Sequence, residues 1–199
     1  DSHPNMCGGP ESWLFILPTI EIETLAVKFE LPVEMVRHLF QTANSRAEFI
    51  DKFFEQYCNE RGKPRWIEKT PKNITKLGYI FSAYPRARFI HMLRDGRDVA
   101  CSLSDKKDKL SLQGAIQRWI DDIEASRNFW QDPRYLVVRY EDLVEKTRPT
   151  LKKVLNFIEE PWDERVLEYY KVDRDLTVPD ANEPNAGKPL FTSSISRWK

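Results

Sequence analysis

An arginine and a serine follow an apolar segment in an order that suits an anion-binding site. Arg94 comes directly after the apolar segment 86–93, and an Asp-Gly pair, which favours a tight turn, follows it. A helix capped by Asp98 would place Ser102 one turn further along the same helix face. A guanidinium, the N–H groups of a helix start and a hydroxyl together can hold a phosphate. For this segment alone, a solvent-facing turn is the alternative interpretation.

Two further polar clusters also follow apolar segments. Lys69 and Thr70 come at the end of "RWIEKTP", and Tyr140, Glu141 and Asp142 come at the end of "RYLVVRYEDL". In open parallel sheets, ligands bind at the carboxyl ends of the strands. We therefore expect these clusters and the Arg94 segment to belong to a single site.

The segments between these clusters indicate which elements position them. Strands are predicted over residues 65–71, 86–93 and 134–143. Helices are predicted over residues 32–43, 45–62, 73–84, 98–105, 111–131, 148–160 and 163–170. The alternation of strands and helices predicts an α/β fold, with three layers in which helices cover a central parallel sheet.

The spacing of apolar residues also predicts which side chains point inward. The helix that begins after Ser45 should bury Phe49, Ile50, Phe53, Phe54 and Tyr57. The helix over 32–43 should bury Val33, Val36, Leu39 and Phe40. The helix over 111–131 should bury Ile116, Trp119, Ile120, Ile123 and Trp130. The strand over 86–93 is apolar enough to be central in a sheet.

Composition excludes some classes of function. The 199 residues suit one domain, 1–199, and the 31 basic residues balance 31 acidic residues. Nucleic-acid binding normally needs a basic excess, so we expect no nucleic-acid partner. No apolar run approaches the roughly 18 residues of a membrane span. The three cysteines, Cys7, Cys58 and Cys101, fit neither a zinc site nor a disulfide framework, which favours a reducing, cytoplasmic setting without a metal.

Taken together, the polar segments resemble the 3′-phosphoadenylyl-sulfate (PAPS)-dependent sulfotransferases. "LRDGRDVACS" is similar to the family's 3′-phosphate motif, and "EKTP", "VRYEDL", "GKP" and "SRW" follow the family's order. The opening "DSHPNMCGGPE" resembles the tyrosylprotein-sulfotransferase-like branch. The resemblance covers residues 1–198 and implies a nucleotide-kinase-like fold.

The resemblance implies roles for individual residues. Arg94 and Ser102 would bind the 3′-phosphate of the donor. Tyr140 and Lys188 would contact the nucleotide, and Lys106 would assist. The plainer interpretations are a strand-end aromatic for Tyr140 and solvated side chains for the two lysines.

The resemblance also implies a catalytic base. Glu11 matches the glutamate that removes the acceptor's proton in the tyrosylprotein branch, and a partly desolvated carboxylate suits that task. Lys69 would stabilise negative charge on the transferred group or the leaving phosphate. The cytosolic branch has a histidine base where this chain has Pro71. The three histidines of this chain fit structural roles better than the role of a base. They are His3, His38 and His91.

One part of the family's pattern has no match. The loop that binds the 5′-phosphosulfate should precede the opening segment, so we expect an incomplete domain that lacks this strand and loop. The implied reaction converts PAPS and a hydroxyl of a small molecule, a carbohydrate or a tyrosine into a sulfate ester and adenosine 3′,5′-bisphosphate. The alternatives are a non-catalytic remnant that binds this bisphosphate and a phosphotransferase of related fold. Acceptor identity and oligomeric state stay open.

Overall fold

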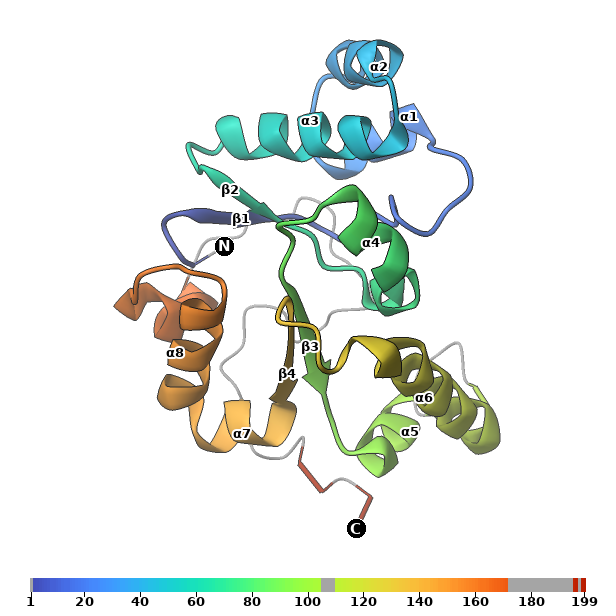
Figure 1. Ribbon diagram of the computed structural model, residues 1–199, viewed down its shortest axis with the longest axis vertical. Helices are drawn as coiled ribbons and strands as arrows, with labels where there is room; N and C mark the ends of the chain where they lie inside the picture. The colour runs from blue at the N-terminus through green and yellow to red at the C-terminus, as the bar shows by residue number, and fades with distance from the viewer. Residues whose placement is uncertain (1, 105–109, 172–194, 197) are drawn as a thin grey trace. The chain divides into compact units, whose positions relative to one another are not determined.

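The computed structural model describes residues 2–104, 110–171, 195–196 and 198–199 (Figure 1). These residues form two compact units. The first unit comprises the described residues up to Pro85 together with 163–171. The second unit comprises those from Arg86 to Trp162 together with those from 195 onward. Lys106 and Lys188 lie outside the described residues, and the single domain over 1–199 stays a prediction.

The first unit is built on a short parallel strand pair. Strand β1 (Met6–Gly8) pairs with β2 (Arg65–Ile67), so that Gly8 lies opposite Ile67. The helices between the strands are α1 (Ile22–Lys28), α2 (Val33–Thr42) and α3 (Arg46–Asn59). After β2 come the 3-10 helix Pro71–Lys76, α4 (Leu77–Ala83) and the 3-10 helix Glu164–Lys171.

Helix α3 supplies the core of this unit. The Ser45 hydroxyl accepts a hydrogen bond from the Glu48 N–H at 3.1 Å, which confirms Ser45 as the N-cap. The predicted inward face is confirmed, because all of its members are buried: Phe49, Ile50, Phe53, Phe54 and Tyr57. Phe29 packs edge-on against three of these rings. Burial stabilises the fold by about 1.5–3 kcal/mol for each large apolar side chain.

The second unit is built on a longer parallel pair. Strand β3 (Phe89–Leu93) pairs with β4 (Tyr135–Arg139), from Phe89 opposite Tyr135 to Leu93 opposite Arg139. The helices are α5 (Gly96–Ser104), α6 (Leu112–Ser126), α7 (Tyr140–Glu145) and α8 (Thr147–Phe157), with a 3-10 turn over Arg127–Phe129. Helices and parallel strands alternate in both units, as the α/β prediction requires.

The predicted inward face of α6 is wrong, and that of α2 is wrong in part, because Val36 is buried but Phe40 is not. In α6, Ile116 and Ile120 are 44% and 40% exposed, and Ala115 is fully buried instead. Trp130, beyond α6, and Phe40, in α2, are also exposed. Helical spacing shows that a helix has an apolar face, but the neighbouring elements decide which residues are covered.

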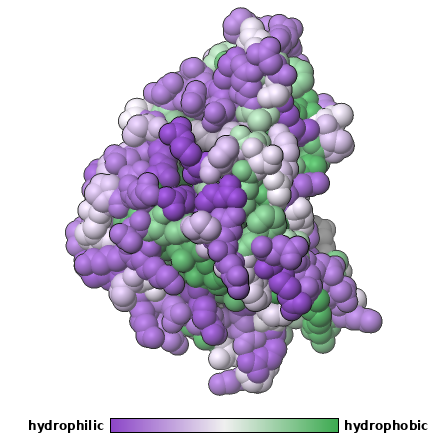
Figure 2. Space-filling view, in the orientation of Figure 1, coloured by the Kyte–Doolittle hydropathy of each residue, from purple (hydrophilic) through white to green (hydrophobic). Residues whose placement is uncertain are grey.

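Strand β3 also differs from the expected central strand. Ile90 and Met92 lie two positions apart, on one face of the strand, and their exposed fractions are 36% and 45%. In Figure 2, some apolar residues are visible on the surface among mostly polar ones. None of the described helices is both long enough and apolar enough to cross a lipid bilayer.

Candidate functional site

The Glu68 carboxylate organises the polar residues at the end of β2. Its Oε1 accepts hydrogen bonds from the Ser12 hydroxyl at 2.8 Å and from the Thr70 hydroxyl at 2.5 Å. Its Oε2 accepts a bond from the Asn73 side-chain amide. The three donors are buried, so these bonds are shielded from water. We call Glu68, Ser12, Thr70 and Asn73 the Glu68 network.

The Glu68 network places Glu11 beside Lys69. Glu11 directly precedes Ser12 and Lys69 directly follows Glu68, so the bond between Ser12 and Glu68 brings the two neighbours together. The Lys69 Nζ lies 3.3 Å from the Glu11 Oε1. The Glu11 side chain is 20% exposed and that of Lys69 is 49% exposed. An ion pair this open to solvent contributes little to stability, so Lys69 can leave Glu11 at small cost.

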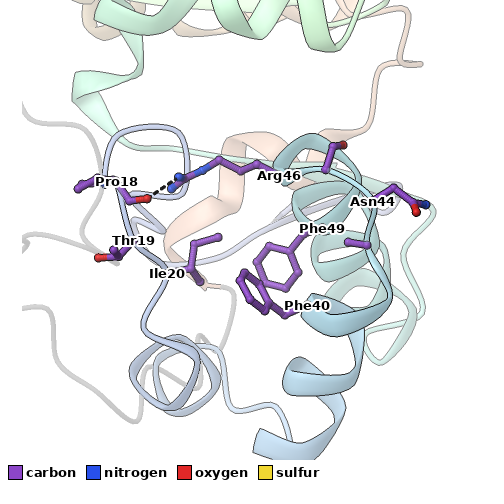
Figure 3. A pocket seen from close by; sticks show the side chains of 9 residues that line it. Pro18, Thr19, Ile20, Phe40, Asn44, Arg46 and Phe49 are labelled. Carbon is purple, nitrogen blue, oxygen red and sulfur yellow. Dashed lines mark hydrogen bonds between the residues drawn. The ribbon is translucent and has the colours of Figure 1, made fainter.

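The loop after Glu11 is held from a second side by Arg46, the first residue of α3. Its guanidinium donates to the backbone carbonyls of Leu14 at 2.8 Å, Pro18 at 3.1 Å and also Leu17. Figure 3 shows Arg46 reaching toward Pro18 at the edge of a hollow. The hollow measures about 590 Å³, and the rings of Phe40 and Phe49 lie against it. Arg46 therefore fixes the path of this loop.

In the second unit, strand register brings two predicted residues together. Arg94 and Tyr140 each follow the last paired position of their strands, Leu93 and Arg139. The Arg94 guanidinium carbon lies 5.2 Å from the centre of the Tyr140 ring, within the range of a cation–π contact. The Arg94 side chain is only 19% exposed, so its charge is partly desolvated. A cation in this setting suits an anionic ligand.

The turn after Arg94 requires a glycine. A Cβ on Gly96 would lie 3.0 Å from the indole ring of Trp119, which is tighter than most real contacts. The same indole donates from Nε1 to the Arg94 carbonyl at 3.2 Å. Trp119 of α6 therefore packs on the turn and fixes the backbone of Arg94.

The start of α5 differs from the predicted anion cradle. The Asp95 carboxylate accepts the Arg97 N–H at 2.9 Å, and the Glu141 carboxylate accepts the Asp95 N–H at 2.9 Å. Hydrogen bonding to Arg97 lowers the pKa of Asp95 from 3.8 to about 2. Carboxylates thus already satisfy two amides of this turn, and side chains remain the better candidates for binding an anion.

The prediction that Asp98 caps α5 is wrong. The helix begins at Gly96, and Asp98 lies inside it, 1% exposed. Its carboxylate accepts the backbone N–H groups of Ser196 at 2.9 Å and Trp198 at 3.3 Å. The Arg94 Nε lies 4.0 Å from the same carboxylate. Asp98 therefore ties Ser196 and Trp198 to the helix that follows Arg94.

Ser102 lies in the predicted helix, and its role in binding a phosphate stays a prediction. It lies in α5, four residues after Asp98 and hence on the same helix face, and it is partly exposed. Glu11 and Lys69 thus meet in the first unit, while Arg94 and Tyr140 meet in the second. The prediction that all of them share one site stays a prediction.

Sequence reasoning missed the role that four residues have in holding these side chains. They are Glu68, Arg46, Glu141 and Asp98. The roles of Glu68 and Glu141 could have been suspected, because Glu68 precedes Lys69 and Glu141 follows Tyr140. Arg46 and Asp98 bind segments far along the chain, so no local pattern predicts these contacts.

Comparisons with known proteins agree on one family. A family model described as "Sulfotransferase family" matches residues 1–164. A protein-tyrosine sulfotransferase of Drosophila melanogaster is 26% identical over the whole of this chain and 43% of its own length. An uncharacterized protein of Aquifex aeolicus is 30% identical over 68% of this chain and 19% of its own length. The chain thus spans less than half the length of these two relatives.

Solved structures show the same fold. The sulfotransferase domain from the curacin biosynthetic pathway superposes with a TM-score of 0.73 at 17% identity. The superposition covers 99% of this chain and 82% of that domain. At this identity the likeness concerns the fold, which is that of sulfotransferase domains.

Proposed function

This chain belongs to the sulfotransferase family, and from that membership we propose that it transfers a sulfuryl group from PAPS to an acceptor hydroxyl. The acceptor oxygen attacks sulfur, and the bond from sulfur to the phosphate oxygen breaks. The hydroxyl proton passes to Glu11, and adenosine 3′,5′-bisphosphate leaves. Sulfate ester and bisphosphate are the two products.

The pair of Glu11 and Lys69 carries this proposal. General-base catalysis needs a carboxylate within hydrogen-bond reach of the acceptor proton. The Glu68 network fixes the neighbours of both residues. Ser12 directly follows Glu11, and Glu68 and Thr70 lie on either side of Lys69. Lys69 is 3.3 Å from Glu11 and can stabilise charge on the transferred group or on the leaving phosphate.

Donor binding is assigned to the second unit. Arg94 would pair with the 3′-phosphate and Ser102 would donate its hydroxyl to it. Tyr140, which already lies against the Arg94 guanidinium, would contact the nucleotide. The partial burial of Arg94 supports this role, because a desolvated guanidinium binds phosphate more strongly than one in water. The resemblance assigns Lys188 and Lys106 to the same nucleotide.

The acceptor is proposed only as a hydroxyl-bearing molecule. The Drosophila relative is named for tyrosine as its acceptor. A carbohydrate or a small-molecule hydroxyl fits the same base equally well, because a shared base does not fix the acceptor. The balance of 31 basic and 31 acidic residues gives no basic excess that would favour an acidic peptide.

The test measures ligand binding and turnover on the full-length protein. Calorimetry compares adenosine 3′,5′-bisphosphate with adenosine 5′-monophosphate and with Mg-ATP. We expect only the bisphosphate to bind tightly, since the 3′-phosphate is the group that Arg94 recognises. Release of bisphosphate from PAPS is then followed with a tyrosine peptide, an oligosaccharide and a phenol as acceptors. Preferential Mg-ATP binding would favour the phosphotransferase, and bisphosphate binding without turnover would favour the non-catalytic remnant.

A further inference from the structure

Two cysteines of the first unit lie in contact. Cys7 is in β1 and Cys58 is in the last turn of α3, and each is 2% exposed. The Cys58 thiol donates to the Cys7 backbone oxygen at 3.9 Å and also hydrogen-bonds to the Cys7 sulfur. The sequence alone gave no reason to pair them, because they are 51 positions apart.

The backbone around both cysteines is fixed by neighbouring contacts. The Lys63 ammonium donates to the carbonyls of His3 at 3.0 Å and Met6 at 2.9 Å, just before Cys7. The Cys58 carbonyl accepts the N–H groups of Arg61 and Lys63, both at 3.0 Å. The loop that follows α3 thus holds β1 and the end of α3 together, with the two thiols between them.

The two thiols have different chemical character. The hydrogen bond from Cys58 lowers the pKa of the Cys7 thiol, against the opposing effect of burial. The charges of Arg61 and Lys63 lower it further. The same hydrogen bond and burial raise the pKa of Cys58. Since the thiolate is the reactive form, Cys7 is the nucleophile of the pair.

We propose that Cys7 and Cys58 form a redox-sensitive dithiol that a peroxide converts into a disulfide. The Cys7 thiolate attacks a peroxide oxygen, which breaks the O–O bond and leaves a sulfenic acid on Cys7 and hydroxide. The Cys58 sulfur then attacks the Cys7 sulfur, and the sulfenic oxygen leaves as water. Two thiols and one hydrogen peroxide therefore give one disulfide and two waters. A dithiol reductant returns the disulfide to two thiols by exchange and is itself oxidised to a disulfide.

The bond would join elements on both sides of the Glu11 loop. Strand β1 leads through residues 9–10 to Glu11, and Arg46 at the other end of α3 holds the loop that follows. A link from β1 to the end of α3 closes this part of the chain into a ring. We expect the oxidised chain to hold the loop more rigidly than the reduced chain.

The experiment oxidises the folded full chain with graded hydrogen peroxide, alkylates the remaining thiols and maps peptides without reduction. The expected result is one linked peptide pair with Cys7 and Cys58, loss of two of the three thiols, and recovery of both with dithiothreitol. Cys101 belongs to the second unit, so Cys101→Ser should behave like the wild type.

Cys58 variants separate the proposal from nonspecific oxidation. In Cys58→Ala no linked pair should form, a sulfenic acid should be trapped on Cys7 by dimedone, and alkylation of Cys7 near neutral pH should slow at least several-fold. Cys58→Ser keeps the shape and serves if the alanine variant does not fold. Links that involve Cys101, or thiols that react only in denaturant, would overturn the proposal.

Discussion

The two units position their polar side chains by different means. In the first unit, Glu68 collects hydrogen bonds from three buried donors, and Glu11 and Lys69 meet because they flank this network. In the second unit, Arg94 and Tyr140 meet because they follow the last pair of two parallel strands in register.

This difference teaches where each unit is vulnerable. A hydrogen-bond network depends on single side chains, so one substitution can displace the residues it holds. Register depends on many backbone bonds, so a side chain at a strand end can change while its neighbours stay in place. If the first unit serves proton transfer and the second serves donor binding, substitutions should separate turnover from affinity.

The largest expected effect is on turnover in the first unit. Glu11→Gln keeps the shape of the side chain but removes the proposed proton acceptor, so kcat should fall by about 10²- to 10⁴-fold. Affinity for adenosine 3′,5′-bisphosphate should stay unchanged by calorimetry. Glu55→Gln, on the exposed side of α3, is the matched control and should keep wild-type kcat. Full activity in Glu11→Gln would remove Glu11 as the base.

The next effect concerns affinity in the second unit. Arg94→Ala removes the proposed phosphate contact, which would contribute about 2–4 kcal/mol, so the Kd for the bisphosphate should rise by roughly 30- to 1,000-fold. Calorimetry measures this change. The control is Arg97→Ala, because the Arg97 side chain is 59% exposed and pairs with Asp95. An equal loss in both variants would point to general electrostatics rather than to a phosphate site.

A third substitution tests the network itself. Glu68→Gln replaces a carboxylate oxygen with an amide donor, so at least one of the Ser12, Thr70 and Asn73 donors loses its acceptor. The free energy of unfolding should fall by about 1–3 kcal/mol, measured by urea denaturation. Turnover should fall with it while bisphosphate affinity holds. A variant with normal kcat would show that the network is not needed to place Glu11.

The smallest effect is a pH dependence in the second unit. Hydrogen bonding to Arg97 holds the pKa of Asp95 at about 2 in the folded chain, against 3.8 for an aspartate without such a partner. A carboxyl with a lowered folded pKa stabilises the fold at pH above 3.8, and this contribution disappears as the pH falls toward 2. The change is small, because both side chains reach solvent.

Acid denaturation of the wild type and of Asp95→Asn measures this dependence. The asparagine variant should be less stable than the wild type near neutral pH, and the gap should narrow below pH 3.8 and close as the pH falls toward 2. Parallel pH profiles for the two proteins would exclude a contribution from this pair.

Local patterns in the sequence predicted some parts of the structure well. The α3 face and its Ser45 cap depend on residues within a few turns of one another, and both are confirmed. The buried face of α6 was wrong, because it depends on which neighbour covers the helix rather than on spacing. The contact between Glu11 and Lys69 joins residues 58 positions apart, so the sequence named both residues without placing them together.

The role of Asp98 could not be predicted from local sequence either, because its partners are distant along the chain. A carboxylate near a helix start usually caps that helix. Here the bonds go to Ser196 and Trp198, 98 and 100 positions away, and the turn amides are taken by Asp95 and Glu141. Buried polar groups must find partners, but only the fold decides which partners are near.

The Arg46 contacts have a consequence for the order in which the parts of the chain fold. The carbonyls of Leu14, Leu17 and Pro18 find their donor some thirty residues later, and the Ser12 hydroxyl finds Glu68 later still. During synthesis from the N-terminus, the loop after Glu11 therefore leaves the ribosome without the groups that shape it. It can settle only when α3 and β2 have followed, so the proposed base is made well before the residues that set it in place.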